Sequence, residues 1–288
     1  MTLTFKQIED DKEWDNYVFS MPKYSFLNSS ARYTYNKNVG VETFRYAIFK
    51  KDELKGIITG NIGNSKLFGK FLECKHSPML LDGTKEEWRE VTEFLKNLAK
   101  ENSCFMFRFS PLLTENELLA EFYEENGFIK APTHNVDALI SQQMDLSKTL
   151  EVLRREMNKT RRNLLNRLLE NKDVTVKILT GKEVFDDSAR FHDETVKFKG
   201  YVDKPTKLLM KELEEQQSRG MCYMVTAYYE GKPFSIWQNT VYGENMHLYQ
   251  AGASTDFRLN NLMVTTLLFW KSLELGKELG LKTYDLFG

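Results

Sequence analysis

The sequence predicts an α/β protein with mixed sheets, built from two similar units in tandem, the second shorter at its end. Three observations support this prediction. The 288 residues suffice for two modest domains, each with its own core. A hydrophobic content of 41% and a charged content of 28% are typical of a globular protein. A weak internal repeat places strands, a helix and a buried strand in the same order in both halves.

The first half shows this order clearly. Residues 45–62 read as two strands around a charged turn, and residues 66–83 read as a further strand pair. An amphipathic helix is predicted over 86–102, and a buried strand over 103–110. The apolar face of the helix consists of Trp88, Val91, Phe94, Leu95 and Leu98.

The second half repeats the order. Residues 222–254 predict three strands joined by tight turns at Gly231 and Gly243. A helix over 261–280 and a strand over 281–287 follow. Each half is therefore expected to form one sheet with a crossing helix.

Residues 145–179 connect the halves and predict a helix of about six turns that leads into a strand. Ser147 is the expected N-cap. The opposite face of the helix is strongly basic, so it is either a solvated surface or a phosphate contact. The expected buried stripe is Leu150, Leu153, Met157, Leu164, Leu165, Leu168 and Leu169. The candidate tRNA contacts on the basic face are Arg155, Lys159 and Arg162.

After its last strand the first half continues with a helix that ends in Tyr-Glu-Glu-Asn-Gly-Phe, where Gly127 is placed to cap it. This phrase resembles the late helix and strand of GNAT acyltransferases. The second half stops at Gly288 without a counterpart. We therefore expect a first GNAT-like unit over 1–145, and a second over 146–288 that lacks its closing segment.

Composition and motif content exclude several classes of protein. The N-terminus is acidic, and no apolar run reaches the length of a membrane span, so we expect a cytoplasmic protein, with a peripheral position at the inner membrane face left open. The three cysteines and four histidines are scattered without metal-ligand spacing, which implies structural thiols and no metal. A net charge of −1 argues against a protein that coats nucleic acid through its overall field.

Acetyl-CoA is disfavoured as the donor. GNAT enzymes hold its pyrophosphate on backbone N–H groups at a helix N-terminus, in a turn whose glycines allow close approach. The equivalent stretch here runs from Arg258 to Met263; it has the arginine and lacks the glycines. Met263 places a long side chain where a phosphate oxygen would lie. No cofactor is therefore predicted.

Several phrases in order resemble the FemABX family of peptidoglycan-precursor aminoacyltransferases. They are FLNSSARYTYNK, DLSKTLEVLRREMNKTRRNLLNR, FHDETVKFKGY, YYEGKPFSIW, HLYQAGAS and YDLFG. No coiled-coil arm is inserted, so the likeness is to the compact FemX type. The resemblance implies a donor aminoacyl-tRNA, and as acceptor the stem-peptide amine of UDP-MurNAc-pentapeptide or its lipid-linked form. The reaction would form cross-bridges in cell-wall biogenesis.

The resemblance also implies residues that bind substrate. Asn36 and Lys37 lie where the family keeps a lysine for the UDP-sugar, shifted by one position. In the phrase that usually reads E-T-x-x-R-x-G-F, Phe198 stands at the arginine position. The candidate contacts for diphosphate or carboxylate are Lys37, Asn36, Lys197, Lys199, Tyr201 and Arg258, with solvated or structurally paired charges as the alternative.

Tyr249 and Asp285 are the candidate catalytic residues. Tyr249 is expected on a strand near the cleft of the second unit, and Asp285 at the end of the last strand, where it would orient an amine. A core tyrosine and a turn-capping aspartate are the alternatives.

The family normally continues past the YDLFG-like strand to a Phe-Lys pair associated with catalysis, and this sequence ends before it. Two other functions therefore stay open beside the aminoacyltransferase. One is a non-catalytic relative that binds cell-wall precursor or tRNA ends, and the other is an acyl-CoA-dependent N-acyltransferase. The transferred amino acid and the oligomeric state are not predicted.

Overall fold

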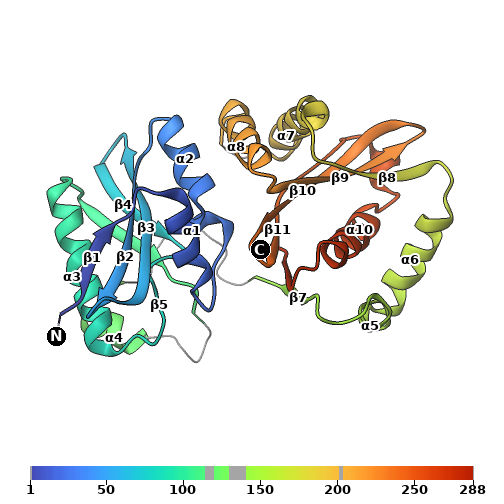
Figure 1. Ribbon diagram of the computed structural model, residues 1–288. Helices are drawn as coiled ribbons and strands as arrows, with labels where there is room; N and C mark the ends of the chain where they lie inside the picture. The colour runs from blue at the N-terminus through green and yellow to red at the C-terminus, as the bar shows by residue number, and fades with distance from the viewer. Residues whose placement is uncertain (1, 114–119, 130–140, 201–203, 288) are drawn as a thin grey trace. The chain divides into compact units, whose positions relative to one another are not determined.

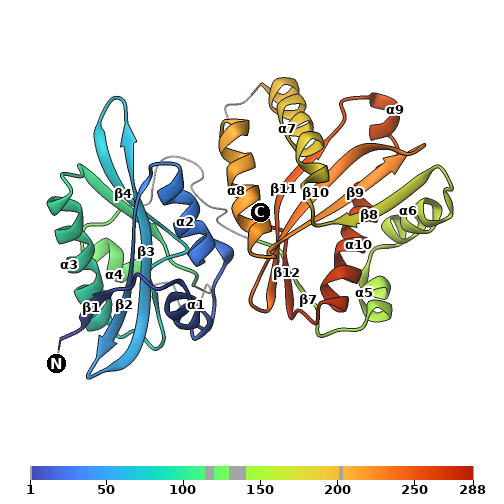
Figure 2. The same cartoon turned by 45° about the horizontal axis from the view of Figure 1, so that its top comes forward.

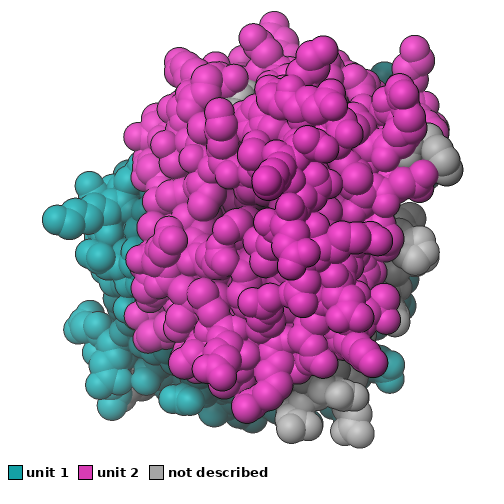
Figure 3. All heavy atoms as spheres, turned by 90° about the vertical axis from the view of Figure 1, so that its right-hand side faces the viewer, with its two compact units in different colours: residues 1–139 teal, residues 140–288 magenta. Residues whose placement is uncertain are grey.

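The computed structural model describes residues 2–113, 120–129, 141–200 and 204–287 (Figure 1). The chain divides into two compact units, residues 1–139 and 140–288, which Figure 3 colours separately. Each unit has one mixed six-stranded sheet and its own apolar core. The predicted fold class is thereby confirmed.

The sheet of the first unit has the strand order β1-β2-β3-β4-β6, and β5 pairs with β3. Its neighbours are antiparallel except β4 and β6, which run parallel because α3 crosses between them. The strands are β1 (Thr4–Gln7), β2 (Glu42–Lys50), β3 (Glu53–Ser65), β4 (Gly69–Lys75), β5 (Met79–Leu80) and β6 (Met106–Ser110).

Helices cover both faces of this sheet (Figure 2). Helix α3 lies on one face, where its residues Val91 and Leu95 pack with Ile48, Ile58 and Leu72 in a buried core. Helices α1 and α2 lie on the other face. The helical segments are α1 (Asp11–Phe19), η1 (Phe26–Asn28), α2 (Ser30–Asn38), α3 (Lys85–Glu101) and α4 (Ala120–Glu125).

Two helix ends of this unit have clear causes in the sequence. Helix α3 begins with a capping box, in which Thr84 Oγ1 accepts from the Glu87 N–H and the Glu87 carboxylate accepts from the Thr84 N–H. Helix α4 is followed by Gly127 at a φ of 78°, and the Phe128 N–H donates to the Tyr123 carbonyl. Gly127 therefore caps α4 as predicted.

The sheet of the second unit has the order β7-β12-β11-β10-β9-β8. Its pairs are antiparallel except β11 with β12, between which α10 crosses. The strands are β7 (Gln143–Asp145), β8 (Val174–Leu179), β9 (Cys222–Tyr229), β10 (Lys232–Tyr242), β11 (Asn245–Ala253) and β12 (Thr283–Asp285).

Helices α7 and α8 lie on one face of this sheet, and α5, α6 and α10 on the other (Figures 1 and 2). Apolar cores form on both faces, around Phe191 and Ile236 on the first and around Leu165 and Leu268 on the second. The helices are α5 (Leu150–Glu156), α6 (Lys159–Glu170), η3 (Lys182–Val184), α7 (Phe185–Lys199), α8 (Thr206–Ser218), α9 (Phe257–Asn260) and α10 (Thr265–Glu278).

The single helix predicted between the halves is wrong, because the chain breaks it into α5 and α6. Met157 is extended, with φ −61° and ψ 144°, and the Asn158 side chain caps α6 by accepting from the Arg161 N–H. Thr149, and not Ser147, is the N-cap of α5. The other residues of the predicted stripe pack in the core, whereas Leu169 is 44% exposed.

The two sheets repeat one plan. Strands β1, β2, β3 and β4 correspond to β8, β9, β10 and β11, and the crossing helix α3 with its strand β6 corresponds to α10 with β12. In both units the strand after the crossing helix is the parallel neighbour of the last antiparallel strand. The internal repeat read from the sequence is therefore a repeat of structure.

Candidate functional site

The first unit contains a small polar hollow beside α2. Arg32 and Asn36 reach it from one face of that helix because they are four residues apart. Strand residues complete the opposite wall. Its polar lining residues are Arg32, Asn36, Thr43, Thr59, Asn61 and Lys75.

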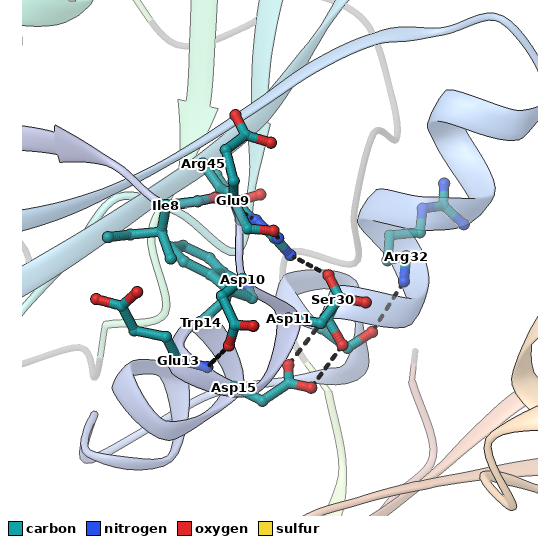
Figure 4. Close-up of polar contacts among 12 residues, drawn as sticks. Ile8, Glu9, Asp10, Asp11, Glu13, Trp14, Asp15, Ser30, Arg32 and Arg45 are labelled. Atoms are coloured by element: carbon teal, nitrogen blue, oxygen red, sulfur yellow. Dashed lines mark hydrogen bonds and ion pairs between the residues drawn. The ribbon is translucent and has the colours of Figure 1, made fainter.

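Contacts behind α2 fix its position (Figure 4). The Asp15 carboxylate accepts from the Ser30 N–H at 2.9 Å and from its hydroxyl at 2.5 Å. Ser29 Oγ accepts from the Arg32 N–H at 3.1 Å and so caps the helix. These bonds hold the first turn of α2, from which Arg32 projects.

A buried arginine supports the same helix from the sheet. Arg45 is 1% exposed, and its guanidinium lies 4.1 Å from the ring centroid of Tyr33. Its Nε donates to the Ile8 carbonyl at 2.7 Å and its Nη2 to the Glu9 carbonyl at 2.5 Å (Figure 4). Nη1 is 2.9 Å from Asp11 Oδ1. Arg45 is therefore a structural cation, and Tyr33 on its other side lines the hollow.

The loop after β4 is bonded to the segment that contains η1. His76 has a φ of 48°, and the Ser77-Pro78 peptide bond is cis. Ser25 Oγ is 2.7 Å from His76 Nδ1, and Asn28 Nδ2 donates to the His76 carbonyl at 3.0 Å. This loop ends the strand that delivers Lys75 to the hollow.

The hollow is suited to an anion. Lys75 Nζ is 3.8 Å from Glu73 Oε2, but Arg108 Nε also donates to that carboxylate at 2.6 Å. Glu73 therefore balances the positive charge of Lys75 only in part, and amide and hydroxyl groups of the hollow stand beside this lysine. Lys37 is exposed, with its Nζ 5.2 Å from the Tyr33 ring centroid, and does not line the hollow.

In the second unit, β11 and β12 share only a short ladder. Their register ends at the pair His247 and Asp285, whereas β11 continues to Ala253. On the side of β10, Gln238 pairs with Gln250 and Asn239 pairs with Leu248, so residue 249 is an extra residue on β11. This β-bulge gives the side chain of residue 249 a direction that it would not have in a regular ladder.

The bulged residue is Tyr249, which meets α8. Its hydroxyl donates to Glu212 Oε2 at 3.0 Å, and Lys204 Nζ donates to the same oxygen at 2.5 Å. The Tyr249 ring also makes an edge contact with Phe287. Glu212 is 1% exposed, so its charge depends on these partners. The three groups form one polar set at the end of the β11 and β12 ladder.

A second small hollow lies between α7 and β11. Its lining includes His192, Gln238, Gln250 and the apolar Phe191 and Leu209.

His192 belongs to a hydrogen-bonded series. Its Nδ1 is 3.0 Å from Thr206 Oγ1, which in turn donates to Asp193. Because the threonine hydroxyl has a single proton and donates it to Asp193, His192 Nδ1 is the donor in its contact with Thr206.

Asp285 is buried, and its carboxylate has structural partners. It accepts from Ser141 Oγ, from Gln143 Nε2 at 2.9 Å and from the Phe287 N–H at 2.7 Å. These bonds join β7 to the end of β12. Asp285 therefore has the partners expected of a turn-capping aspartate.

The other predicted contacts are surface residues. Lys197 and Lys199 are exposed in the last turn of α7, and the Arg258 side chain is 90% exposed, 3.6 Å from Asp256. Tyr201 lies outside the described residues.

The basic face of α5 and α6 serves two purposes. Arg162 Nη1 donates to the carbonyls of Arg155 and Met157, at 2.5 and 2.7 Å, and so joins the two helices. The Arg155 and Lys159 side chains are exposed. Arg162 therefore has a structural partner set, whereas Arg155 and Lys159 face solvent.

The start of α10 shows why a CoA pyrophosphate is disfavoured there. Met263 adopts a φ of 52° and is 47% exposed. No side chain caps this helix at Val264. A long side chain in a left-handed conformation thus occupies the turn that glycines form in a phosphate-binding loop.

Sequence reasoning missed Lys75, Lys204, Glu212 and His192. Lys75 lies at the end of β4, and no motif in the sequence marks it. Glu212 on α8 meets Tyr249 on β11 and Lys204 before α8 only in the folded unit, and His192 comes from α7. The buried thiols are protonated: burial raises the pKa of Cys74, and raises that of Cys222 to about 12.

Comparison with known proteins supports the fold. Residues 154–288 match the model of the acetyltransferase (GNAT) domain. No curated protein sequence matches the chain. Among the part of the chain that is described, no helix is long and apolar enough to cross a bilayer.

Solved structures match over almost the whole chain. FemX is 13% identical, with a TM-score of 0.81, covering 100% of this chain and 89% of its own. A tandem GNAT protein from the clavulanic acid biosynthesis pathway is 12% identical with a TM-score of 0.61, over 98% and 89%. L-PGS from Bacillus licheniformis is 13% identical with a TM-score of 0.55, over 96% and 77%.

The domain model identifies residues 154–288 as an acetyltransferase (GNAT) domain, and the solved structures show a tandem GNAT fold over both units. The fold resembles that of FemX, as the ordered sequence phrases predict.

Proposed function

We propose that the chain is an aminoacyltransferase that moves an amino acid from aminoacyl-tRNA to the stem-peptide amine of a peptidoglycan precursor. The observation that carries the proposal is the likeness to FemX over both units, with a TM-score of 0.81. The ordered phrases of the sequence and the glycine-free start of α10 support it.

In this proposal the hollow of the first unit takes the acidic part of the precursor. Arg32 offers a planar fork for a diphosphate or carboxylate, and Lys75 adds a point charge. Asn36 and Asn61 supply amide groups for the neighbouring sugar or peptide. Lys37, Lys197, Lys199 and Arg258 remain exposed candidates for additional anion contacts.

The second unit takes the aminoacyl ester. The buried Glu212 carboxylate, held by Tyr249 and Lys204, is suited to the α-ammonium group of the donor. In this proposal His192 is the base that takes a proton from the acceptor's ammonium group, which makes the amine nucleophilic. The amine nitrogen then attacks the ester carbon. A C–N bond forms, the bond to the ribose oxygen breaks, and that oxygen receives the second nitrogen proton.

The tRNA body needs cationic contacts. Arg155 and Lys159 are our candidates because their side chains face solvent on neighbouring helix ends. Arg162 is a weaker candidate, since its guanidinium is bonded to two carbonyls.

The test is to incubate the protein with UDP-MurNAc-pentapeptide and a mixture of charged tRNAs, and to analyse the precursor by mass spectrometry. We expect the mass of one added amino-acid residue. Arg32→Gln and Lys75→Gln should raise KM for the precursor about tenfold each, whereas Lys12→Gln, an exposed lysine on α1, should not. His192→Asn should lower kcat about a hundredfold.

Three results would refute the proposal in different ways. Calorimetric binding of precursor without any product from charged tRNA would support a non-catalytic relative. Transfer from acyl-CoA, together with a thermal shift by CoA, would support the N-acyltransferase alternative. Absence of both precursor binding and product would contradict the proposed substrate class.

A further inference from the structure

Exposed apolar side chains gather at one end of the first unit's sheet. Leu67 is 80% exposed and Phe68 is 65% exposed, on the turn between β3 and β4. Phe105 and Met106, at the start of β6, are 52% and 38% exposed. We call these four residues the apolar tip. Large apolar side chains that are gathered and exposed in this way mark an interaction surface.

The two segments of the apolar tip form one patch. The ring centroids of Phe68 and Phe105 are 5.8 Å apart, and the Phe105 N–H donates to the Lys70 carbonyl at 2.9 Å. Figure 2 shows the β3 and β4 hairpin projecting at its turn. The patch is therefore a protruding turn supported by a neighbouring strand, and not a groove.

The surroundings of the apolar tip are positively charged. Residues 61–71 and 102–106 contain Lys66 and Lys70 and no acidic residue, although the whole chain has 41 acidic and 40 basic residues. Lys66 is exposed. Lys70 Nζ lies 3.1 Å from Glu42, in a pair whose two side chains are about half exposed. Such an exposed pair is weak, so an anionic surface can compete for the lysine.

Size and charge together identify the partner. A stable protein interface uses roughly 20–30 residues on each side, far more than this turn offers. A lipid bilayer needs no matching surface, because it accepts protruding apolar side chains and places lysines at its phosphate layer. We propose that the apolar tip docks the first unit on an anionic bilayer, with Leu67 and Phe68 among the acyl chains and Lys66 and Lys70 at the headgroups.

This inference does not depend on the proposed transferase function, so binding to vesicles tests it directly. The full chain is sedimented with vesicles of phosphatidylcholine mixed with phosphatidylglycerol, and with vesicles of phosphatidylcholine alone. We expect partitioning into the mixed vesicles that weakens with salt. The double variant Leu67→Ser, Phe68→Ser should lower the partition coefficient about tenfold or more. Lys66→Gln should lower it about fivefold at low salt.

A matched control separates the apolar tip from general hydrophobicity. Leu279→Ser replaces an apolar side chain that is 39% exposed in the second unit, and should bind vesicles like the wild type. Phe68→Trp should show a blue shift of its added emission on mixed vesicles. Unchanged thermal melts would confirm that the variants are folded.

Three outcomes would overturn the proposal. The first is that the wild type is not recovered with the mixed vesicles. The second is that the double variant binds them as strongly as the wild type does. The third is that the wild type sediments as a dimer and the double variant as a monomer. The last result would assign the apolar tip to a second copy of the chain.

Discussion

Arg45 shows how a charge is kept inside the first unit. Its guanidinium has almost no exposure, and it bonds two backbone carbonyls while facing the Tyr33 ring. The carbonyls of Ile8 and Glu9 lie before α1, so one side chain joins the N-terminal segment to the sheet. Removing it leaves these acceptors without their charged donor.

We expect Arg45→Met to lower the free energy of unfolding of the first unit by about 3 kcal/mol. Lys6→Gln removes an exposed ion pair with Glu13 and should change the stability by less than about 0.5 kcal/mol. Urea unfolding followed by circular dichroism measures both. Equal effects of the two substitutions would show that burial of Arg45 does not determine its contribution.

At the scale of elements, the start of α3 couples helix capping to pH. The Glu87 carboxylate accepts from Lys50 Nζ at 2.8 Å and from the Thr84 N–H at 3.1 Å. The hydrogen bond from Lys50 is the largest cause that holds the pKa of Glu87 below the ordinary value of a glutamate. Because the folded pKa is the lower one, Glu87 stabilises the fold above its unfolded pKa, and this contribution is lost as pH falls through the folded pKa.

Stability of the first unit should therefore decrease as the pH falls below about 4.5. Glu87→Gln should flatten this acid limb and lower the stability at neutral pH, whereas Glu86→Gln, on the exposed side of the same turn, should retain the limb. Thermal melts between neutral and acid pH give the comparison. An unchanged acid limb in Glu87→Gln would contradict the assignment.

The α5 and α6 pair separates structural cations from contact cations. Arg162→Gln should lower stability by about 1–2 kcal/mol, since it frees two carbonyls at the helix junction. Arg155→Gln and Lys159→Gln should leave stability unchanged, weaken tRNA binding and reduce its salt slope by about one each. Anisotropy of labelled tRNA over a salt series, with parallel melts, distinguishes the two roles.

Periodicity predicts the main elements because each strand or helix carries its own apolar spacing. Strands β2 to β6 and β8 to β12, together with α3 and α10, are found in this way, whereas the short strands β1 and β7 are not. The break at Met157 escapes this reading because the apolar spacing continues through it, although Asn158 is a recognisable cap residue. Asn36 is predicted as a substrate contact from a family phrase, and the structure places it in the hollow. Lys75 and Glu212 are recognised as site residues only in the folded chain, because the residues around them are distant in sequence.

On the scale of the molecule, each unit has its own sheet and cores. Local unfolding is therefore expected to follow the units. Arg45→Met should accelerate amide hydrogen exchange in peptides of residues 2–113 and leave the exchange of β9 and β10 unchanged. Mass spectrometry of peptic peptides measures this. Faster exchange throughout both sheets would show that the units open together.

The bulge at Tyr249 has a consequence for comparing distant chains. Before the bulge, Met246 and Leu248 enter the core with α10, and His247 lies on the opposite face of the strand. After it, Gln250 and Gly252 lie on the face covered by α7. The phase of inward and outward residues thus changes within one strand. An aligned sequence that is one residue shorter between 245 and 253 would exchange the faces of one half of β11. Such a gap marks either an error of alignment or a relative whose second unit has lost the contact of Tyr249 with Glu212.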